Sequence, residues 1–165
     1  AGTYFIAIDG MKSEDFGRAA FDIKMRDVGA QEAACKAAPT LADGQTVNGT
    51  TIGAGDKFNT SCGGREDGQS SPDRMYKIVL PTRQRVRLSL STGTWDGVLA
   101  LRRACLDPSG SSSARGAEVM CNNDADDSNH SRIEVTLDAG TYYVLVDGHQ
   151  AGNEGPFSLE YRVVK

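Results

Sequence analysis

The chain has 165 residues, 39% of them hydrophobic and 24% charged, which is enough for one ordinary domain with a small addition. This composition excludes a wholly disordered chain and a collagen-like one. Because the formal net charge is −4 and no apolar run approaches the ~18 residues of a membrane-spanning helix, we expect neither a nucleic-acid partner nor a membrane span.

The first residues of the chain recur near its end. Residues 1–10, AGTYFIAIDG, line up with residues 139–148, AGTYYVLVDG, and residues 21–26 line up with 157–162. The offset is 138 residues in the first block and 136 in the second. This period is longer than that of solenoid repeats and is typical of tandem whole domains. We therefore predict three parts: residues 1–27 as the C-terminal β-hairpin of a preceding repeat, 28–34 as a linker, and 35–165 as a complete domain.

The remaining elements follow in chain order. Residues 28–38 form the one plausible helix, with Gly29 inside it and Pro39 after it. Seven segments rich in Val, Ile, Leu, Tyr and Thr are predicted strands: 75–80, 84–91, 97–103, 117–121, 132–137, 141–147 and 157–164. Many short strands with Gly- and Ser-rich turns predict an all-β, antiparallel β-sandwich with an extra N-terminal β-hairpin.

Three arginines, Arg83, Arg85 and Arg87, stand two residues apart along the second of these segments and the turn before it. Side chains with this spacing share one face of a strand. We expect a single solvated face there and no nucleic-acid site.

Four cysteines stand at positions 35, 62, 105 and 121. None belongs to a Cys-x-x-Cys pair, which makes zinc improbable. An even number of cysteines favours disulfides, and therefore an oxidising compartment outside the cytosol. Three pairings are open on sequence alone. We favour Cys35–Cys62 and Cys105–Cys121 because each closes a local loop beside the strands.

Five short motifs occur in a fixed order within residues 48–165. They are SPDRMYKIVL from Ser71, TWDGVLAL from Thr94, CNND from Cys121, GTYYVLVDG from Gly140 and GPFSL from Gly155. In order and spacing they resemble the bacterial pre-peptidase C-terminal domain family. The extra cysteines and the SCGG segment at 61–64 resemble variants found in large surface proteins of social deltaproteobacteria. The resemblance implies a jelly-roll-like β-sandwich that binds rather than catalyses, and several relatives bind calcium.

The loop 122–128, NNDADDS, concentrates three carboxylates and two amides. Oxygen donors of this kind suit a hard cation such as Ca²⁺. The loop is not an EF-hand, since Asn129 and Val135 stand where that motif needs Gly and Glu. The family resemblance implies that Asp96 faces the loop. We predict a calcium site made of Asp96, Asn122, Asp124, Asp126 and Asp127. The alternative is a solvated turn, because Asn, Asp and Ser are common turn residues.

Three aromatic residues are candidate ligand contacts. Trp95 is either a core anchor between the sheets or an exposed binding residue. Tyr142 and Tyr143 are consecutive in a strand, so one faces the core and the other is free for a surface contact. The two histidines, His130 and His149, stand in no recognisable catalytic setting, and the sequence has no nucleophile elbow or phosphate loop. We expect no enzyme.

These features predict a non-catalytic module of the bacterial cell surface or the extracellular space, for adhesion or matrix binding. Its expected ligand is an extracellular protein or polysaccharide, and its expected neighbours are further copies or repeats contacted through the N-terminal hairpin. Two alternatives stay open. One is a processing or targeting module of a secreted peptidase. The other is a fibre subunit that assembles by exchange of the N-terminal hairpin.

Overall fold

The structure is a computed structural model that describes residues 5, 17, 29–63, 71–106, 117–125, 128 and 130–164. The predicted N-terminal hairpin, residues 1–27, lies outside the described residues apart from Phe5 and Gly17. Within the described ranges, no helix is long and apolar enough to cross a membrane.

The described chain contains one helix and eight strands. They are α1 (Gly29–Ala37), β1 (Thr46–Thr50), β2 (Arg74–Leu80), β3 (Gln84–Ser91), β4 (Gly97–Arg102), β5 (Glu118–Asn122), β6 (Ser131–Leu137), β7 (Gly140–Gly148) and β8 (Pro156–Val164). The predicted helix and the seven predicted strands match α1 and β2 to β8 to within one residue at either end. Strand β1 is absent from the prediction.

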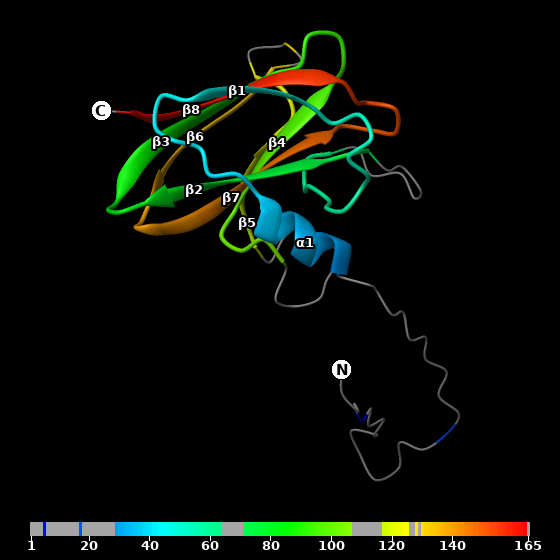
Figure 1. The fold of residues 1–165 in the computed structure, drawn as a ribbon, viewed down its shortest axis with the longest axis horizontal. Coiled ribbons are helices and arrows are strands. Elements are labelled where there is room, and N and C mark those ends of the chain that lie inside the picture. Colours follow the sequence, from blue (N-terminus) through cyan, green and yellow to red (C-terminus); the bar gives the residue numbers. More distant parts are fainter. Residues whose placement is uncertain are drawn as a thin grey trace.

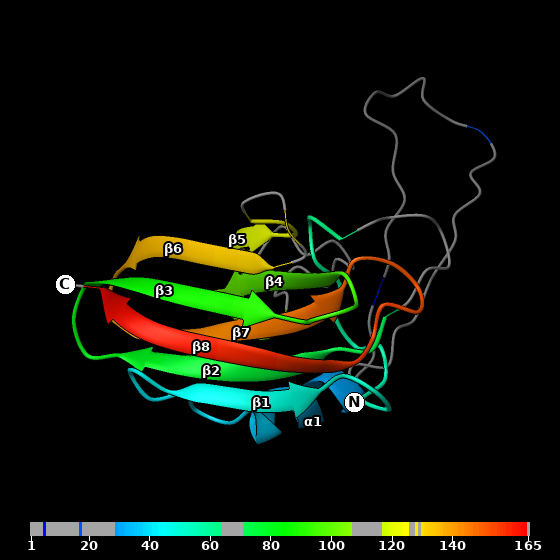
Figure 2. The same cartoon turned by 90° about the horizontal axis from the view of Figure 1, so that it is seen from above.

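The strands form two four-stranded sheets that pack face to face (Figures 1 and 2). Sheet I has the order β1-β8-β3-β6, sheet II has the order β2-β7-β4-β5, and every strand pair is antiparallel. This interleaved order of eight strands is a jelly roll. The prediction of an all-β, antiparallel, jelly-roll-like β-sandwich is confirmed.

The segment that repeats residues 1–27 is not a hairpin. Strand β7 is central in sheet II, between β2 and β4, whereas β8 is central in sheet I, between β1 and β3. Residues 149–155 cross from one sheet to the other instead of turning back within one. The interpretation of this repeated unit as a hairpin is therefore wrong for the described copy, which is an arch that joins the two sheets.

The main core lies between the sheets and follows from the alternation of each strand. In β3, Val86, Leu88 and Leu90 are buried, and so are Ile133 of β6 and Leu159 of β8. Opposite them, β7 contributes Tyr142, Val144 and Val146, whose neighbours in the strand point to the other side of sheet II.

Helix α1 covers the outer side of sheet II and gives the fold a second core (Figure 1). This cluster joins Ala38 and Phe58 to Met75 of β2, Ala100 of β4 and Leu145 of β7. Every residue of β4 is buried because both faces of the strand are covered. The segment 28–34, predicted as a linker, is mostly the first part of α1.

Two disulfides link the outer layer to the sandwich, and both pairings differ from the predicted ones. Cys35 of α1 pairs with Cys105, which follows β4, and Cys62 pairs with Cys121 of β5. The preference for local loops fails because α1 and the segment around Cys62 cross the outer side of sheet II. There each meets a cysteine that is distant in sequence, at separations of 70 and 59 residues.

Candidate functional site

The acidic loop joins the end of β5 to the start of β6 and lies beside the start of β4. Ser131, the first residue of β6, ties these ends together: its Oγ lies 2.6 Å from the carbonyl oxygens of Gly97 and Asn123. Asp96 directly precedes β4 and its carbonyl oxygen accepts a hydrogen bond from the His149 N–H at 3.0 Å. Residues from three interstrand connections therefore meet at this end of the sandwich.

Two side-chain oxygens at this end are buried without a donor. They are Asp96 Oδ1 and Asn123 Oδ1, and no hydrogen-bond donor of the described residues reaches either. Burial raises the pKa of Asp96; the His149 imidazole opposes this rise, and the negative charge of Asp124 adds to it. Buried oxygens without donors are costly unless a cation or water satisfies them. Carboxylate and amide oxygens are the donor types that Ca²⁺ prefers.

The predicted ligands differ in what they do. The side chain of Asn122 makes two hydrogen bonds to the backbone: its Oδ1 accepts from the Arg132 N–H at 2.9 Å, and its Nδ2 donates to the Asp124 carbonyl at 3.0 Å. Asp124 is exposed, and its Oδ2 accepts from Asn123 Nδ2 at 2.9 Å. Asp126 and Asp127 lie outside the described residues. Within the part of the chain that the structure describes, no three His, Cys, Asp or Glu side chains form a ready metal group.

Asn123 is the residue that the sequence prediction left out. It stands between two predicted ligands in the run Asn122-Asn123-Asp124. Only the fold shows which of the two amides keeps a free oxygen: Asn122 Oδ1 is taken by the backbone of β6, while Asn123 Oδ1 is not.

The three candidate aromatic contacts belong to the packed interior. Trp95 is 5% exposed and its Nε1 donates to the Pro156 carbonyl at 2.8 Å. Tyr142 is 6% exposed, and its hydroxyl lies 3.1 Å from the Asp138 carbonyl. Tyr143 is half-buried against the second core below α1. Trp95 is therefore a core anchor and Tyr142 the tyrosine that faces the core, so neither is exposed for a ligand contact. Tyr143 as a ligand contact stays a prediction.

A second polar cluster lies at the same end of β2 and β7, on the α1 side of sheet II. The register of β2 and β7 ends at the pair Arg74 and Val146, and the residues next to this pair, Asp73 and Asp147, lie close enough to interact. Both are nearly inaccessible, at 3% and 6% exposed. Asp73 Oδ2 accepts from the backbone N–H groups of Lys57 and Phe58, at 2.5 and 2.8 Å. Asp147 Oδ1 accepts from its neighbour's N–H at 2.8 Å.

Burial raises the pKa of Asp73 to about 6, against the opposing effect of its two backbone donors. Burial and the nearby charge of Asp73 raise the pKa of Asp147 well above its ordinary value. Asp73 also lines a cavity of about 690 Å³ between α1, the 49–57 segment and β2. Burial of the two carboxyl groups close together therefore favours their protonated forms.

No family model matches the sequence, and no curated protein matches it either. Solved structures with a similar fold include the pre-peptidase C-terminal domain of a Bacillus anthracis collagenase, at 13% identity and a TM-score of 0.49, covering 76% of this chain and 94% of that domain. Another is the periplasmic g-type lysozyme inhibitor PliG of Aeromonas hydrophila, at 12% identity and 0.49, covering 77% and 96%.

A third is CorA, a surface-associated copper-binding protein of Methylomicrobium album BG8, at 10% identity and a TM-score of 0.43, covering 78% of this chain and 98% of that one. The first of these structures belongs to the family that the sequence motifs resemble. Membership of that family stays a prediction. The function proposed below rests on the residues of this chain.

Proposed function

We propose that the chain is a non-catalytic binding module of the extracellular space or the bacterial cell surface, stabilised by calcium and serving adhesion or matrix binding. The observation that supports calcium is the pair of buried oxygens without donors, Asp96 Oδ1 and Asn123 Oδ1, beside the Asp124 carboxylate. A hard cation bound there would satisfy both oxygens and offset the repulsion between the carboxylates. The remaining predicted ligands, Asp126 and Asp127, would complete its coordination.

Two disulfides support the proposed location. All four cysteines are paired, and the cross-links join distant parts of the chain. Disulfides of this structural kind persist in oxidising compartments and are rare in the cytosol.

Thermal unfolding of the oxidised protein, in EDTA and then in excess Ca²⁺, tests the calcium proposal. At 100 times its Kd a ligand adds ~2.7 kcal/mol to the free energy of unfolding, which is about 5–10 °C in midpoint for a chain of this size. Asp124→Asn removes a charge from the loop and should abolish most of the rise.

Asp138→Asn is the matched control, because Asp138 is an exposed aspartate that pairs with Arg83. Its calcium-induced rise should equal that of the wild type. A wild-type midpoint that does not move with Ca²⁺ would make the loop a solvated turn and refute the calcium proposal.

The internal repeat favours a second candidate, self-assembly by strand exchange. Residues 1–10 and 21–26 are similar in sequence to β7 and β8, each of which occupies an inner position of one sheet. A segment with these sequences could serve a neighbouring copy in which those central positions are open.

Mass measured by light scattering over a range of concentrations tests this candidate. Assembly predicts a mass that rises with concentration and returns to that of a monomer when residues 1–27 are deleted. A full chain that stays monomeric at high concentration would contradict the exchange.

A further inference from the structure

The outer face of sheet I is a continuous polar surface. Strand register aligns its outward residues in rows across the sheet, and two of these rows carry most of its charged residues. The first row is Thr46, Glu160, Ser89 and Arg132, and the second is Arg162, Arg87 and Glu134. Arg85 stands in the next row on the same face, two residues from Arg87. The prediction of one solvated face holds for Arg85 and Arg87, whereas Arg83 lies in the turn before β3 and pairs with Asp138.

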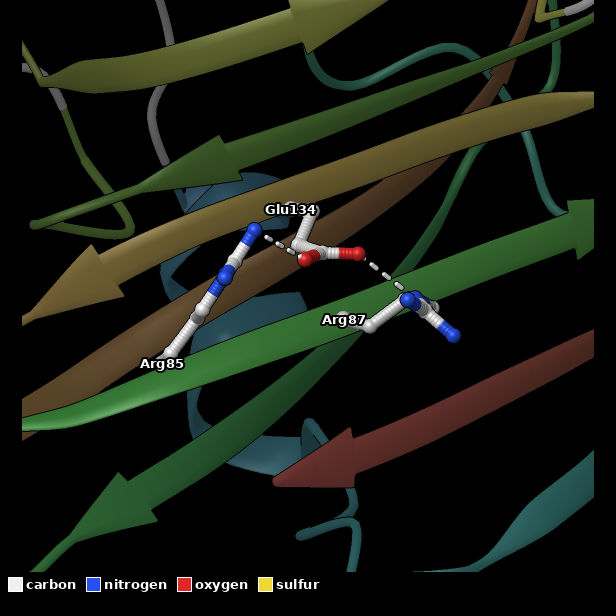
Figure 3. A network of polar contacts seen from close by, with 3 residues as sticks. All are labelled: Arg85, Arg87 and Glu134. Carbon is white, nitrogen blue, oxygen red and sulfur yellow. Dashed lines mark hydrogen bonds and ion pairs between the residues drawn. The ribbon is translucent and has the colours of Figure 1, made fainter. Parts of the chain in front are cut away.

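This face is basic although the chain as a whole is acidic. It carries four arginines and two glutamates among its strand residues. Glu134 binds two of the arginines at once, with Arg85 Nη2 at 2.6 Å and Arg87 Nε at 2.7 Å (Figure 3). Glu160 binds Arg162 Nε at 2.7 Å. Three guanidinium groups therefore share two carboxylates.

The exposures show which charge faces a ligand. The side chains of Arg85, Arg87 and Arg162 are 60%, 44% and 59% exposed, whereas those of Glu134 and Glu160 are 22% and 30% exposed. The carboxylates are the more buried partners, and each holds a guanidinium group through its Nε or Nη2 atom. The guanidinium groups project beyond them, with donors left over for an approaching anion.

Beside the arginines the face is hollowed by a groove of about 390 Å³. Small hydroxyl side chains line it, from Thr46 of β1, Ser158 of β8, and Ser89 and Ser91 of β3. His130 contributes from the acidic loop's connection to β6. Hydroxyl groups both donate and accept hydrogen bonds, which suits a ligand that itself carries many hydroxyl groups.

From these features we propose that the outer face of sheet I binds an anionic polysaccharide whose charges are carboxylates, as in a polyuronate. The guanidinium groups bind the carboxylates, as Arg85 and Arg87 already bind Glu134. The serine-lined groove binds the sugar hydroxyls. This inference rests on the proposed binding function and names its ligand class and its surface.

Two other classes of ligand, an acidic protein and a single-stranded nucleic acid, fit this face less well. A protein partner usually inserts aromatic or large apolar anchors into an interface. The exposed large apolar residues of the described chain are Phe5, Ile52, Val79 and Met120, and none belongs to a strand of sheet I. Single-stranded nucleic acid is bound largely by stacking on aromatic side chains, which the described strands of this face do not present outward.

Fluorescence anisotropy with a labelled oligogalacturonate tests the proposal on the full, oxidised chain in Ca²⁺. The wild type should bind, and the affinity should fall as NaCl rises from about 20 to about 300 mM. Arg85→Gln combined with Arg87→Gln should weaken binding at least about tenfold, because it removes two charge-assisted contacts. Glu134→Gln should tighten binding several-fold, since it releases both arginines, and it tests the same face if the double variant unfolds.

Arg83→Gln is the matched control: Arg83 is 74% exposed and pairs with Asp138 in the turn. Its affinity should equal that of the wild type. Neutral dextran should not compete. Absence of binding, equal weakening by Arg83→Gln, or tighter binding of dextran sulfate, polyglutamate or single-stranded DNA at equal charge would overturn the proposal. The calcium-induced rise in the unfolding midpoint should persist in the arginine variants. Loss of oligogalacturonate binding is then attributed to the face of sheet I, and loss of the calcium effect to the acidic loop.

Discussion

At the scale of single residues, the pair Asp73 and Asp147 is the least expected feature. Like charges close to each other are destabilising, and burial increases that cost. Both side chains are nevertheless buried. Two effects reduce the cost of burying them. Their raised pKa values favour the neutral, protonated forms, and backbone N–H groups donate hydrogen bonds to both.

These carboxylates predict an unusual dependence of stability on pH. Since their folded pKa values exceed the unfolded value of 3.8, the native state binds more protons, and their contribution to stability is lost as pH rises. A shift from 3.8 to about 6 makes Asp73 alone responsible for about 3 kcal/mol, lost between about pH 4 and 7. Asp147→Asn keeps the acceptor for Gly148 N–H and removes the contribution of Asp147. The free energy of unfolding of this variant, measured with urea in EDTA, should therefore decline less steeply with pH than that of the wild type.

Asp138→Asn, at an exposed position, should leave the decline unchanged. A decline equally steep in Asp147→Asn and the wild type would show that Asp147 does not take up a proton in the native state.

The candidate calcium loop could be found from sequence because its oxygen-rich residues are consecutive. The roles within it could not. Asn122 and Asn123 are alike in sequence, yet the backbone of β6 donates a hydrogen bond to the Oδ1 of Asn122 and not to that of Asn123. The role of Trp95 could not be found from sequence either. Its buried Nε1 needs an acceptor, and that acceptor is the Pro156 carbonyl, 61 residues away in the chain, which comes close only in the packed sandwich.

At the scale of elements, α1 makes one sheet different from the other. It closes the outer side of sheet II with an apolar layer, while sheet I keeps a polar outer face. The helix is short and alanine-rich, and isolated helices of this length are marginal in water. Its position therefore depends on tertiary contacts, on the Gln31 hydrogen bond to the Lys57 carbonyl, and on the Cys35–Cys105 disulfide.

Removal of that disulfide tests this dependence. Cys35→Ser combined with Cys105→Ser should lower the free energy of unfolding by about 4 kcal/mol, as the chain-entropy model gives for a separation of 70 residues. Urea unfolding without reductant measures it. A loss below about 1 kcal/mol would mean that apolar contacts alone hold the helix, contrary to this account.

The strong alternation of β3, β6 and β8 allowed these strands to be predicted from sequence. Strand β1, with sequence TVNGT, escaped because it is an edge strand with one apolar side chain, Val47, and a glycine. Gly49 is needed there: a Cβ at this position would lie 2.7 Å from the Phe157 ring. Cysteine pairing escaped because it depends on the path of α1 and the Cys62 segment over sheet II, which short-range loop closure does not describe.

At the scale of the whole molecule, the described copy of the repeated segment places one inner strand in each sheet, β7 in sheet II and β8 in sheet I. The repeat itself could be read from sequence, and so could the class of fold. The assignment of its two strands to different sheets could not, because an apolar strand, an Asp-Gly pair, a polar connection and an alternating strand fit a hairpin and an arch equally well. Strand order is a property of pairing across the chain, and it appears only in the register of β7 with β2 and β4, and of β8 with β1 and β3.

The central place of β8 has a consequence for synthesis. Strands β1 and β3 cannot pair with each other, since β8 lies between them, and β8 is the last strand of the jelly roll to leave the ribosome. Sheet I is therefore incomplete, and its apolar side chains are not fully covered, until residues 156–164 emerge. Chains dominated by such long-range pairing fold slowly. The sandwich is therefore completed only after its final strand has been made.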